Sequence, residues 1–250
     1  MVGATTSVLS HRRAAGLAAV LAALIVWDAW AGVLPNVGLW PDVLIAAFIV
    51  LPVTFAVPWL VLPVAPSRAV AVLVLILVAL AAIFYLAGFG SLFNVTKLLA
   101  LTGIGFLFVQ AFEALSWVVL IAVVIPWVDA LSVWRGPTNY VVSEKPSLFE
   151  RISIEFRLPG ETGSANIGPP DILFFALFLA AASRFGLRLS WTWLSMVGLL
   201  SLTLIMTTVF DFDGLPALPA IALGFLLPNA DLLWRAIRDR SARDPRRSPT

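Results

Sequence analysis

The sequence predicts an all-α fold: a polytopic bundle of about eight transmembrane helices, with a short β-strand or hairpin in one polar loop. The first observation is composition. Of 250 residues, 61% are hydrophobic and only 12% are charged, whereas soluble domains are roughly 45–50% apolar and about 25% charged. The second is that apolar runs of bilayer-spanning length, about 20 residues, follow one another along the chain. The third is one long polar stretch, residues 135–168, between two groups of runs.

Residue usage excludes several kinds of site. The chain has no cysteine, which excludes disulfides and thiolate metal ligands. Its one histidine, His11, lies in the N-terminal tail, which argues against a histidine-based triad or zinc site, and we expect no metal and no cofactor. The net charge is only +2, and the basic excess lies in the C-terminal tail. We interpret that tail as a cytoplasmic anchor on the membrane surface and expect no nucleic-acid partner.

Proline, glycine and charged residues separate the apolar runs. The predicted spans are 14–34, 42–64, 68–88, 95–111, 114–134, 169–187, 191–210 and 215–234. The first contains Ala29-Trp30-Ala31, which could pass for a signal-peptide cleavage site. Because further spans follow at once, we interpret it as a retained span. Only Gln110 and Glu113 interrupt the fourth and fifth spans, which predicts a tight turn between them.

The polar stretch holds four basic and four acidic residues and one strand-like segment. Residues Arg151–Leu158 alternate polar and apolar side chains, a period of two that is typical of a half-buried strand. Pro159 and Gly160 end this predicted strand, and we expect Gly160–Gly168 to be a flexible approach to the next span.

The positive-inside rule predicts the orientation. With a cytoplasmic N-terminus and eight spans, eleven arginines fall inside, and the 135–168 loop falls outside. We therefore expect a multi-pass protein of a prokaryotic plasma membrane with both termini in the cytoplasm.

Ionisable groups within spans are functional candidates, because an aspartate at the centre of a membrane helix costs about 2.5–3.5 kcal/mol on insertion scales. Asp28, Lys97, Glu113 and Asp231 lie toward the ends of apolar runs, and we interpret them as interfacial or snorkelling groups.

Asp129 and Asp171 are different. Asp129 lies roughly a turn and a half inside the outer end of one predicted helix, and Asp171 lies just inside the outer start of the next. The two helices are consecutive and antiparallel, so both carboxyls lie at similar depth. Two carboxyls in a low-dielectric site tend to share one proton, and such a pair can activate a water with one member and protonate a carbonyl oxygen with the other. From these residues alone, helix packing or proton relay remain equally open.

Three segments in order resemble the presenilin and signal peptide peptidase family of intramembrane aspartyl proteases. Val128-Asp129, followed by Arg135-Gly136-Pro137, resembles the family's Tyr-Asp helix and its basic exit. Gly168-Pro169-Pro170-Asp171 resembles the Gly-x-Gly-Asp helix start. One span later, Pro216-Ala217-Leu218-Pro219 matches the Pro-Ala-Leu motif. The resemblance runs from about Asn94 to Trp234.

The resemblance implies that Asp129 and Asp171 are catalytic, with Gly168, Pro169 and Pro170 and the Pro216–Pro219 segment supporting the site. It implies hydrolysis of peptide bonds in single-span membrane proteins or signal peptides. Residues 1–250 would then form one membrane domain, with N-terminal spans over 1–111, catalytic spans over 112–234 and a basic cytoplasmic tail over 235–250. An exposed strand edge could receive the unwound substrate, and Arg151–Leu158 is a candidate.

The chain departs from the family in two residues and one span. Val128 stands where the family has tyrosine, and Pro170 stands where it has the second glycine. We count eight spans where the family has nine. Proline removes a backbone donor immediately before Asp171. An inactive scaffold of the same fold, or less readily a proton-coupled transporter, are therefore the alternative functions.

Overall fold

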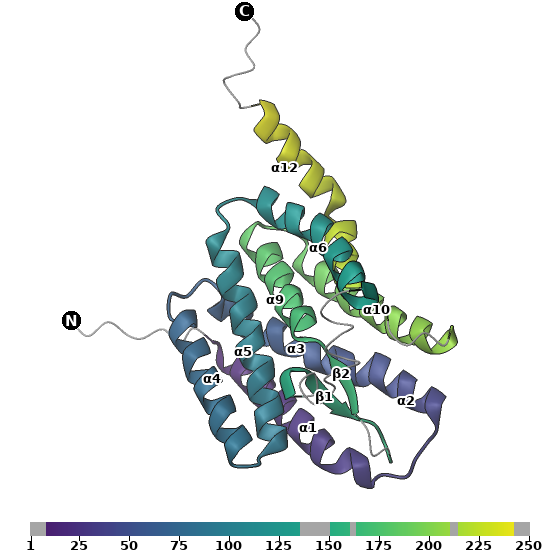
Figure 1. Ribbon diagram of the computed structural model, residues 1–250. Helices are drawn as coiled ribbons and strands as arrows, with labels where there is room; N and C mark the ends of the chain where they lie inside the picture. The colour runs from purple at the N-terminus through teal and green to yellow at the C-terminus, as the bar shows by residue number, and fades with distance from the viewer. Residues whose placement is uncertain (1–8, 136–150, 161–163, 211–214, 243–250) are drawn as a thin grey trace, which may run out of the picture.

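The computed structural model describes residues 9–135, 151–160, 164–210 and 215–242. This part of the chain is mostly helical, and Figure 1 shows the helices gathered into one bundle. A helical segment occupies each predicted span: α1 (His11–Trp30) with η1 (Ala31–Val33); α2 (Leu39–Ile45), η2 (Ala46–Val50), α3 (Leu51–Val61) and η3 (Leu62–Val64) in one run; α4 (Val70–Leu86); α5 (Gly90–Ala111); α6 (Leu115–Arg135); α9 (Pro169–Arg184); α10 (Leu189–Val209); and α11 (Leu218–Leu226) continued by η4 (Leu227–Asn229) and α12 (Ala230–Ala242).

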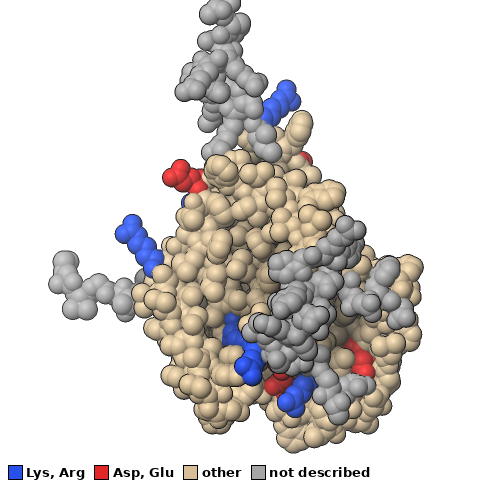
Figure 2. All heavy atoms as spheres, viewed as in Figure 1, with Lys and Arg blue, Asp and Glu red and all other residues tan. Residues whose placement is uncertain are grey.

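Length and composition mark this as a helical membrane protein. Within the described ranges, five helical runs are long and apolar enough to cross a bilayer: His11–Val33, Leu39–Val64, Gly90–Ala111, Leu115–Ser132 and Leu189–Val209. Large apolar side chains are exposed on several of them, as expected where lipid and not water surrounds the helix. On the face that Figure 2 shows, few described atoms are coloured as charged, and the described surface visible across the middle of the bundle is mostly tan. The number of spans beyond these five stays a prediction.

The turn between α5 and α6 is tight, as the sequence predicts. α5 ends at Ala111 and α6 begins at Leu115. The Gln110 Nε2 atom donates to the Ala65 carbonyl at 2.6 Å, which ties this end of α5 to the loop after η3. Glu113 is exposed in the turn, in agreement with an interfacial position.

Two short strands follow the part of the polar loop that lies outside the described residues. β1 (Ile154–Arg157) pairs antiparallel with β2 (Ser164–Ile167), and Ile154 lies opposite Ile167. The predicted strand is confirmed over β1, where burial alternates along the four residues. The predicted flexible approach is wrong over Ser164–Ile167, because these residues complete a hairpin with β1. An isolated sequence pattern could not show this pairing, since β2 is short and lacks a strong alternation of its own.

Gly160 lies three residues after the end of β1, at a position where only glycine fits. Its φ is +68°, and its N–H donates to the Ala31 carbonyl at 3.0 Å. A Cβ atom at this position would lie 2.3 Å from the Asn36 backbone nitrogen. The hairpin is therefore held directly against the end of α1 and the loop that follows it.

α9 has the longest unbroken run of buried residues among the described helices, and Figure 1 shows it in the middle, between α5, α6 and α10. Every residue from Phe175 to Ala182 is buried, so the helix is apolar all round, as a helix enclosed by others must be. It packs against α5, α10 and α11. At Gly105 of α5 an added Cβ would lie 2.4 Å from the Leu173 carbonyl oxygen of α9, so the two backbones approach closely there.

The close approach of α5 and α9 at Gly105 can be tested by substitution. Gly105→Ala should destabilise the protein by about 1–3 kcal/mol, because the new methyl group meets backbone that cannot move aside. Gly198→Ala is the matched control: it lies inside α10 with nothing within 4 Å of the added Cβ, and it should be neutral or stabilising by up to about 1 kcal/mol. Thermal denaturation in detergent measures both. Equal midpoints for the two variants would contradict the close approach.

Hydrogen bonds join the C-terminal end of α11 to the start of α10. Asn229, which is fully buried, donates to the Thr192 hydroxyl at 2.7 Å and accepts from the Arg188 backbone N–H at 2.9 Å. The Arg188 guanidinium binds both carboxylate oxygens of Asp231 at 2.7 and 2.8 Å. Asp231 is exposed, as an interfacial group should be. These hydrogen bonds fix the end of α11 that lies opposite the candidate site. Beyond this end, α12 projects away from the bundle in Figure 1.

Candidate active site

Asp129 lies on α6 and contacts the start of α11. It follows Pro126 by three residues, and that proline cannot continue the helical hydrogen-bond ladder. The Asp129 Oδ2 atom accepts a hydrogen bond from the Leu218 backbone N–H at 3.0 Å. Leu218 itself is buried, with 3% of its surface exposed. The Pro-Ala-Leu segment and the first aspartate, 89 positions apart, are therefore in direct contact.

The start of α11 explains why this bond forms. Ala217 is the N-cap residue, Leu218 is the first helical residue and Pro219 is the second. The first N–H groups of a helix have no partner within the helix, and proline carries no N–H at all. The Leu218 N–H therefore needs an acceptor from elsewhere, and the Asp129 carboxyl on α6 supplies it. Pro216, Ala217 and Pro219 lie around this contact and are partly buried.

Asp171 lies in the first turn of α9 and binds the residue that caps it. Gly168 is the N-cap residue, and its N–H donates to the Asp171 Oδ2 atom at 3.1 Å. A Cβ atom on Gly168 would lie only 3.1 Å from that same oxygen. Glycine at 168 therefore leaves room for the carboxyl to fold back onto the cap.

Pro169 and Pro170 are the first two residues of α9. Prolines are well tolerated there, because the N–H groups at these positions would have no partner within the helix. The missing donor of Pro170, a departure from the family pattern, thus removes no helical hydrogen bond. The Asp171 N–H still donates to the Gly168 carbonyl at 3.1 Å.

The two aspartates act on each other electrostatically. α11 packs against both α6 and α9 and so links the helices that carry them. Each carboxyl meets a backbone N–H at the beginning of a helix, where the helix dipole stabilises negative charge. Each bond uses Oδ2, and a carboxyl carries a second oxygen that can also accept a hydrogen bond. Direct or one-water contact between the two carboxyls stays a prediction.

The aspartate contact on α11 can be tested through stability. Asp129→Ala should destabilise the protein by about 1–3 kcal/mol, because it leaves the buried Leu218 N–H without its acceptor. Asp129→Asn should cost less, since its amide oxygen can still accept from the same N–H. Chemical or thermal unfolding of the two variants measures the difference. If Ala and Asn unfold at the same midpoint, the contact contributes nothing.

The structure places other predicted residues differently. Val128, at the position of the family tyrosine, is 51% exposed and contributes little to the site. The predicted snorkelling position of Lys97 is wrong: only 8% of the residue is exposed, and its ammonium donates to the Ser153 carbonyl at 2.5 Å. Asp28 is half-buried and accepts from the Ser91 hydroxyl. The basic exit at Gly136-Pro137 lies outside the described residues.

The predicted docking edge on Arg151–Leu158 is closed. Backbone groups of Ser153, Glu155 and Arg157 bind side chains of α1 and α5. A strand cannot be added where the backbone groups already have partners. Sequence reasoning missed this, because the partners Trp27 and Asn94 lie far from β1 along the chain.

Sequence reasoning also missed Asp42. This acid, near the start of α2, is only 3% exposed. Its place near the beginning of an apolar run, after Pro41, gave the only available signal. Within the described residues, His, Cys, Asp and Glu side chains form no cluster of three or more that could hold a metal ion.

Comparison with protein-family models gives no match, and comparison with curated proteins gives none either. Membership of the presenilin and signal peptide peptidase family stays a prediction from the resemblance of the three sequence segments.

Proposed function

We propose that this protein is an intramembrane aspartyl protease of the presenilin and signal peptide peptidase type, with Asp129 and Asp171 as its catalytic pair. The observation that carries the proposal is the hydrogen bond from the Leu218 N–H to the Asp129 carboxyl. It joins the Pro-Ala-Leu segment to the first aspartate, while the second aspartate interacts electrostatically with the first. Three segments that resemble one family in sequence order thus also adjoin one another through α6, α9 and α11.

The chemistry needs only the two carboxyls and a water. One carboxylate takes a proton from the water as the water oxygen bonds to the scissile carbonyl carbon. The other carboxyl, protonated at the start, donates its proton to the carbonyl oxygen, which gives a tetrahedral diol. Transfer of a proton to the amide nitrogen and cleavage of the C–N bond then release an amine and a carboxylic acid. No metal and no cofactor take part in this sequence.

Substrate docking is proposed at β2, because the outer edge of β1 is occupied. Glu155 binds Asn94 with both backbone groups, so these groups point away from β2. Asn166 lies opposite Glu155 in the hairpin, so β2 is the strand on the side away from Asn94 and α5. A substrate strand on this edge would run toward Gly168 and Asp171, the residues that follow β2. The substrates are single-span membrane proteins or signal peptides.

The bilayer is the second partner. We propose eight spans, both termini in the cytoplasm and a prokaryotic plasma membrane as the location, on the basis of the arginine distribution.

The experiment is incubation of the purified protein in liposomes with a panel of tagged single-span substrates, with products mapped by mass spectrometry. Cleavage inside the span of at least one substrate, by wild type and not by Asp129→Ala, is expected. An absence of products on the whole panel would favour an inactive scaffold. Proton flux into the same liposomes without substrate would favour a transporter.

A further inference from the structure

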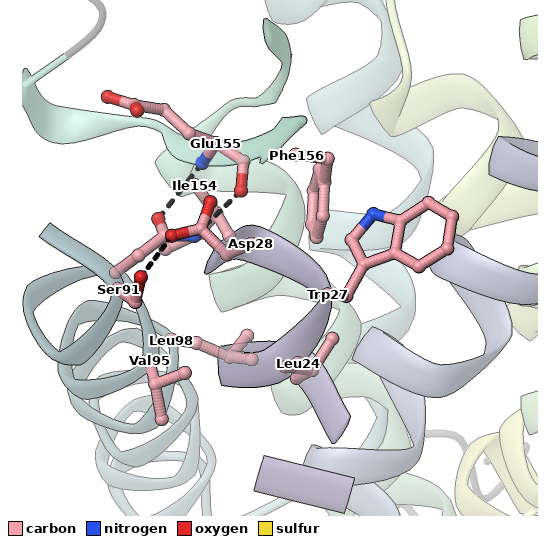
Figure 3. A pocket seen from close by; sticks show the side chains of 10 residues that line it. Leu24, Trp27, Asp28, Ser91, Val95, Leu98, Ile154, Glu155 and Phe156 are labelled. Atoms are coloured by element: carbon pink, nitrogen blue, oxygen red, sulfur yellow. Dashed lines mark hydrogen bonds between the residues drawn. The ribbon is translucent and has the colours of Figure 1, made fainter. Parts of the chain in front are cut away.

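The outer edge of β1 is held by side chains and not by another strand. Backbone groups of alternate residues of a strand point to opposite edges. Ser153, Glu155 and Arg157 therefore direct their polar backbone groups away from β2, toward α1 and α5. In Figure 3, Glu155 lies over Ser91 and Val95 of α5, and dashed lines mark the hydrogen bonds of its backbone.

Asn94 makes the central contact. Its Nδ2 atom donates to the Glu155 carbonyl at 2.7 Å, and its Oδ1 atom accepts from the Glu155 N–H at 2.9 Å. One primary amide thus binds both groups of one residue, as a neighbouring strand would. An aspartate could accept but not donate here, and an aliphatic side chain could do neither.

Lys97 and Trp27 extend the contact on either side. One turn further along α5, the Lys97 ammonium donates to the carbonyls of Ser153 and Arg151 at 2.5 and 3.2 Å. From α1, the Trp27 Nε1 atom donates to the Arg157 carbonyl at 3.0 Å. The Lys97 ammonium also lies 4.3 Å from the centre of the Phe93 ring and interacts electrostatically with Glu155. Side chains of α1 and α5 therefore hold β1 at Glu155 and Arg157, and the residue before it at Ser153.

The chain connects this edge to Asp171 by a short path. Glu155 lies opposite Asn166 in the hairpin. Two residues after Asn166, Gly168 caps α9 and donates its N–H to the Asp171 carboxyl. A displacement of β1 would therefore move β2, and β2 would move the residue that holds the Asp171 side chain.

We propose that Asn94 is a positioning residue: its amide holds the outer edge of β1 and thereby fixes, through β2 and Gly168, the first turn of α9 and the Asp171 carboxyl. The expected effect of Asn94 on catalysis depends on the proposed function, whereas its effect on the position of the first turn of α9 does not. Asn94 lies in α5, a helix long and apolar enough to cross a bilayer, where a polar side chain is costly unless it has partners. Its two bonds to one backbone residue satisfy its amide and explain its place there.

The test compares Asn94→Leu with wild type in the full-length protein by hydrogen exchange and by steady-state kinetics. Asn94→Leu should speed amide exchange in Ile154–Arg157 and in Ser164–Asp171. It should lower kcat by about 100-fold, the cost expected when a reacting group shifts by about 1 Å. KM should change little, since Asn94 lies on the side of β1 away from β2. Asn94→Asp keeps one of the two bonds and should give intermediate exchange and an intermediate kcat.

Thr96→Val is the matched control. Thr96 lies on the same helix and is more deeply buried than Asn94, and its hydroxyl donates to the Leu92 carbonyl of its own helix. It should leave both exchange and kcat unchanged. Unaltered exchange in Asn94→Leu would overturn the proposal, and so would faster exchange with an unchanged kcat. If wild type cleaves no substrate, the protease proposal fails, and exchange over Gly168–Asp171 alone decides whether Asn94 positions the start of α9.

Discussion

Asp129→Asn and Asp171→Asn should each reduce cleavage by more than about 10⁴-fold, the upper range of what general acid–base catalysis contributes. Asparagine has nearly the shape of aspartate but can neither take a proton from water nor donate one as an acid. Since each carboxyl supplies a different half of the same step, the loss of either one should be enough. Both variants should fold and insert, because removing a buried charge is rarely destabilising when the hydrogen-bond acceptor is kept.

The measurement is cleavage of the best substrate from the liposome panel, with far-ultraviolet circular dichroism to verify folding. Asp231→Asn is the matched control, because Asp231 is exposed and pairs with Arg188 at the other end of α11. It should cleave as wild type does. Pro170→Gly should also stay active, since Pro170 occupies a position in α9 where no N–H is required. Wild-type rates in either aspartate variant would remove that residue from the catalytic pair.

A cysteine at position 147 should react completely with a membrane-impermeant maleimide on intact cells. The chain has no cysteine of its own, so Ser147→Cys gives labelling without background. Ser147 lies outside the described residues, in the loop that the arginine distribution places outside the cell. Ser248→Cys, in the basic tail, should react only after the membrane is permeabilised.

The orientation of the loop also decides which side of the membrane the Asp171 end of α9 faces. Asp171 lies in the first turn of α9 and Arg184 ends it, so the two lie near opposite ends of a helix of 16 residues, which is about 24 Å long at roughly 1.5 Å per residue. Whichever side of the membrane the hairpin faces, the Arg184 end of α9 faces the opposite side. Reaction of the cysteine at 147 only after permeabilisation would reverse the topology. It would then reverse the membrane orientation expected of the substrates.

The sequence determined the helical membrane fold, because each apolar run carries its own reason to be a helix. A backbone in lipid must satisfy its hydrogen bonds internally, and a run of about 20 apolar residues can do so only as a helix. The same local logic identified β1, through its alternation, and the tight turn between α5 and α6. It also singled out Asp129 and Asp171, since an acid inside a predicted span is conspicuous by its cost.

Tertiary structure decided which polar groups meet. The Leu218 N–H and the Ser153 and Glu155 backbone groups lack partners within their own helix or strand, so their acceptors and donors come from wherever packing brings a side chain near. Asn94 and Lys97 are 61 and 56 positions from the residues they bind. A pattern of residue types reports the local environment of a position. The partner of an unpaired backbone group depends on the packing of helices distant in sequence, and only the folded bundle determines it.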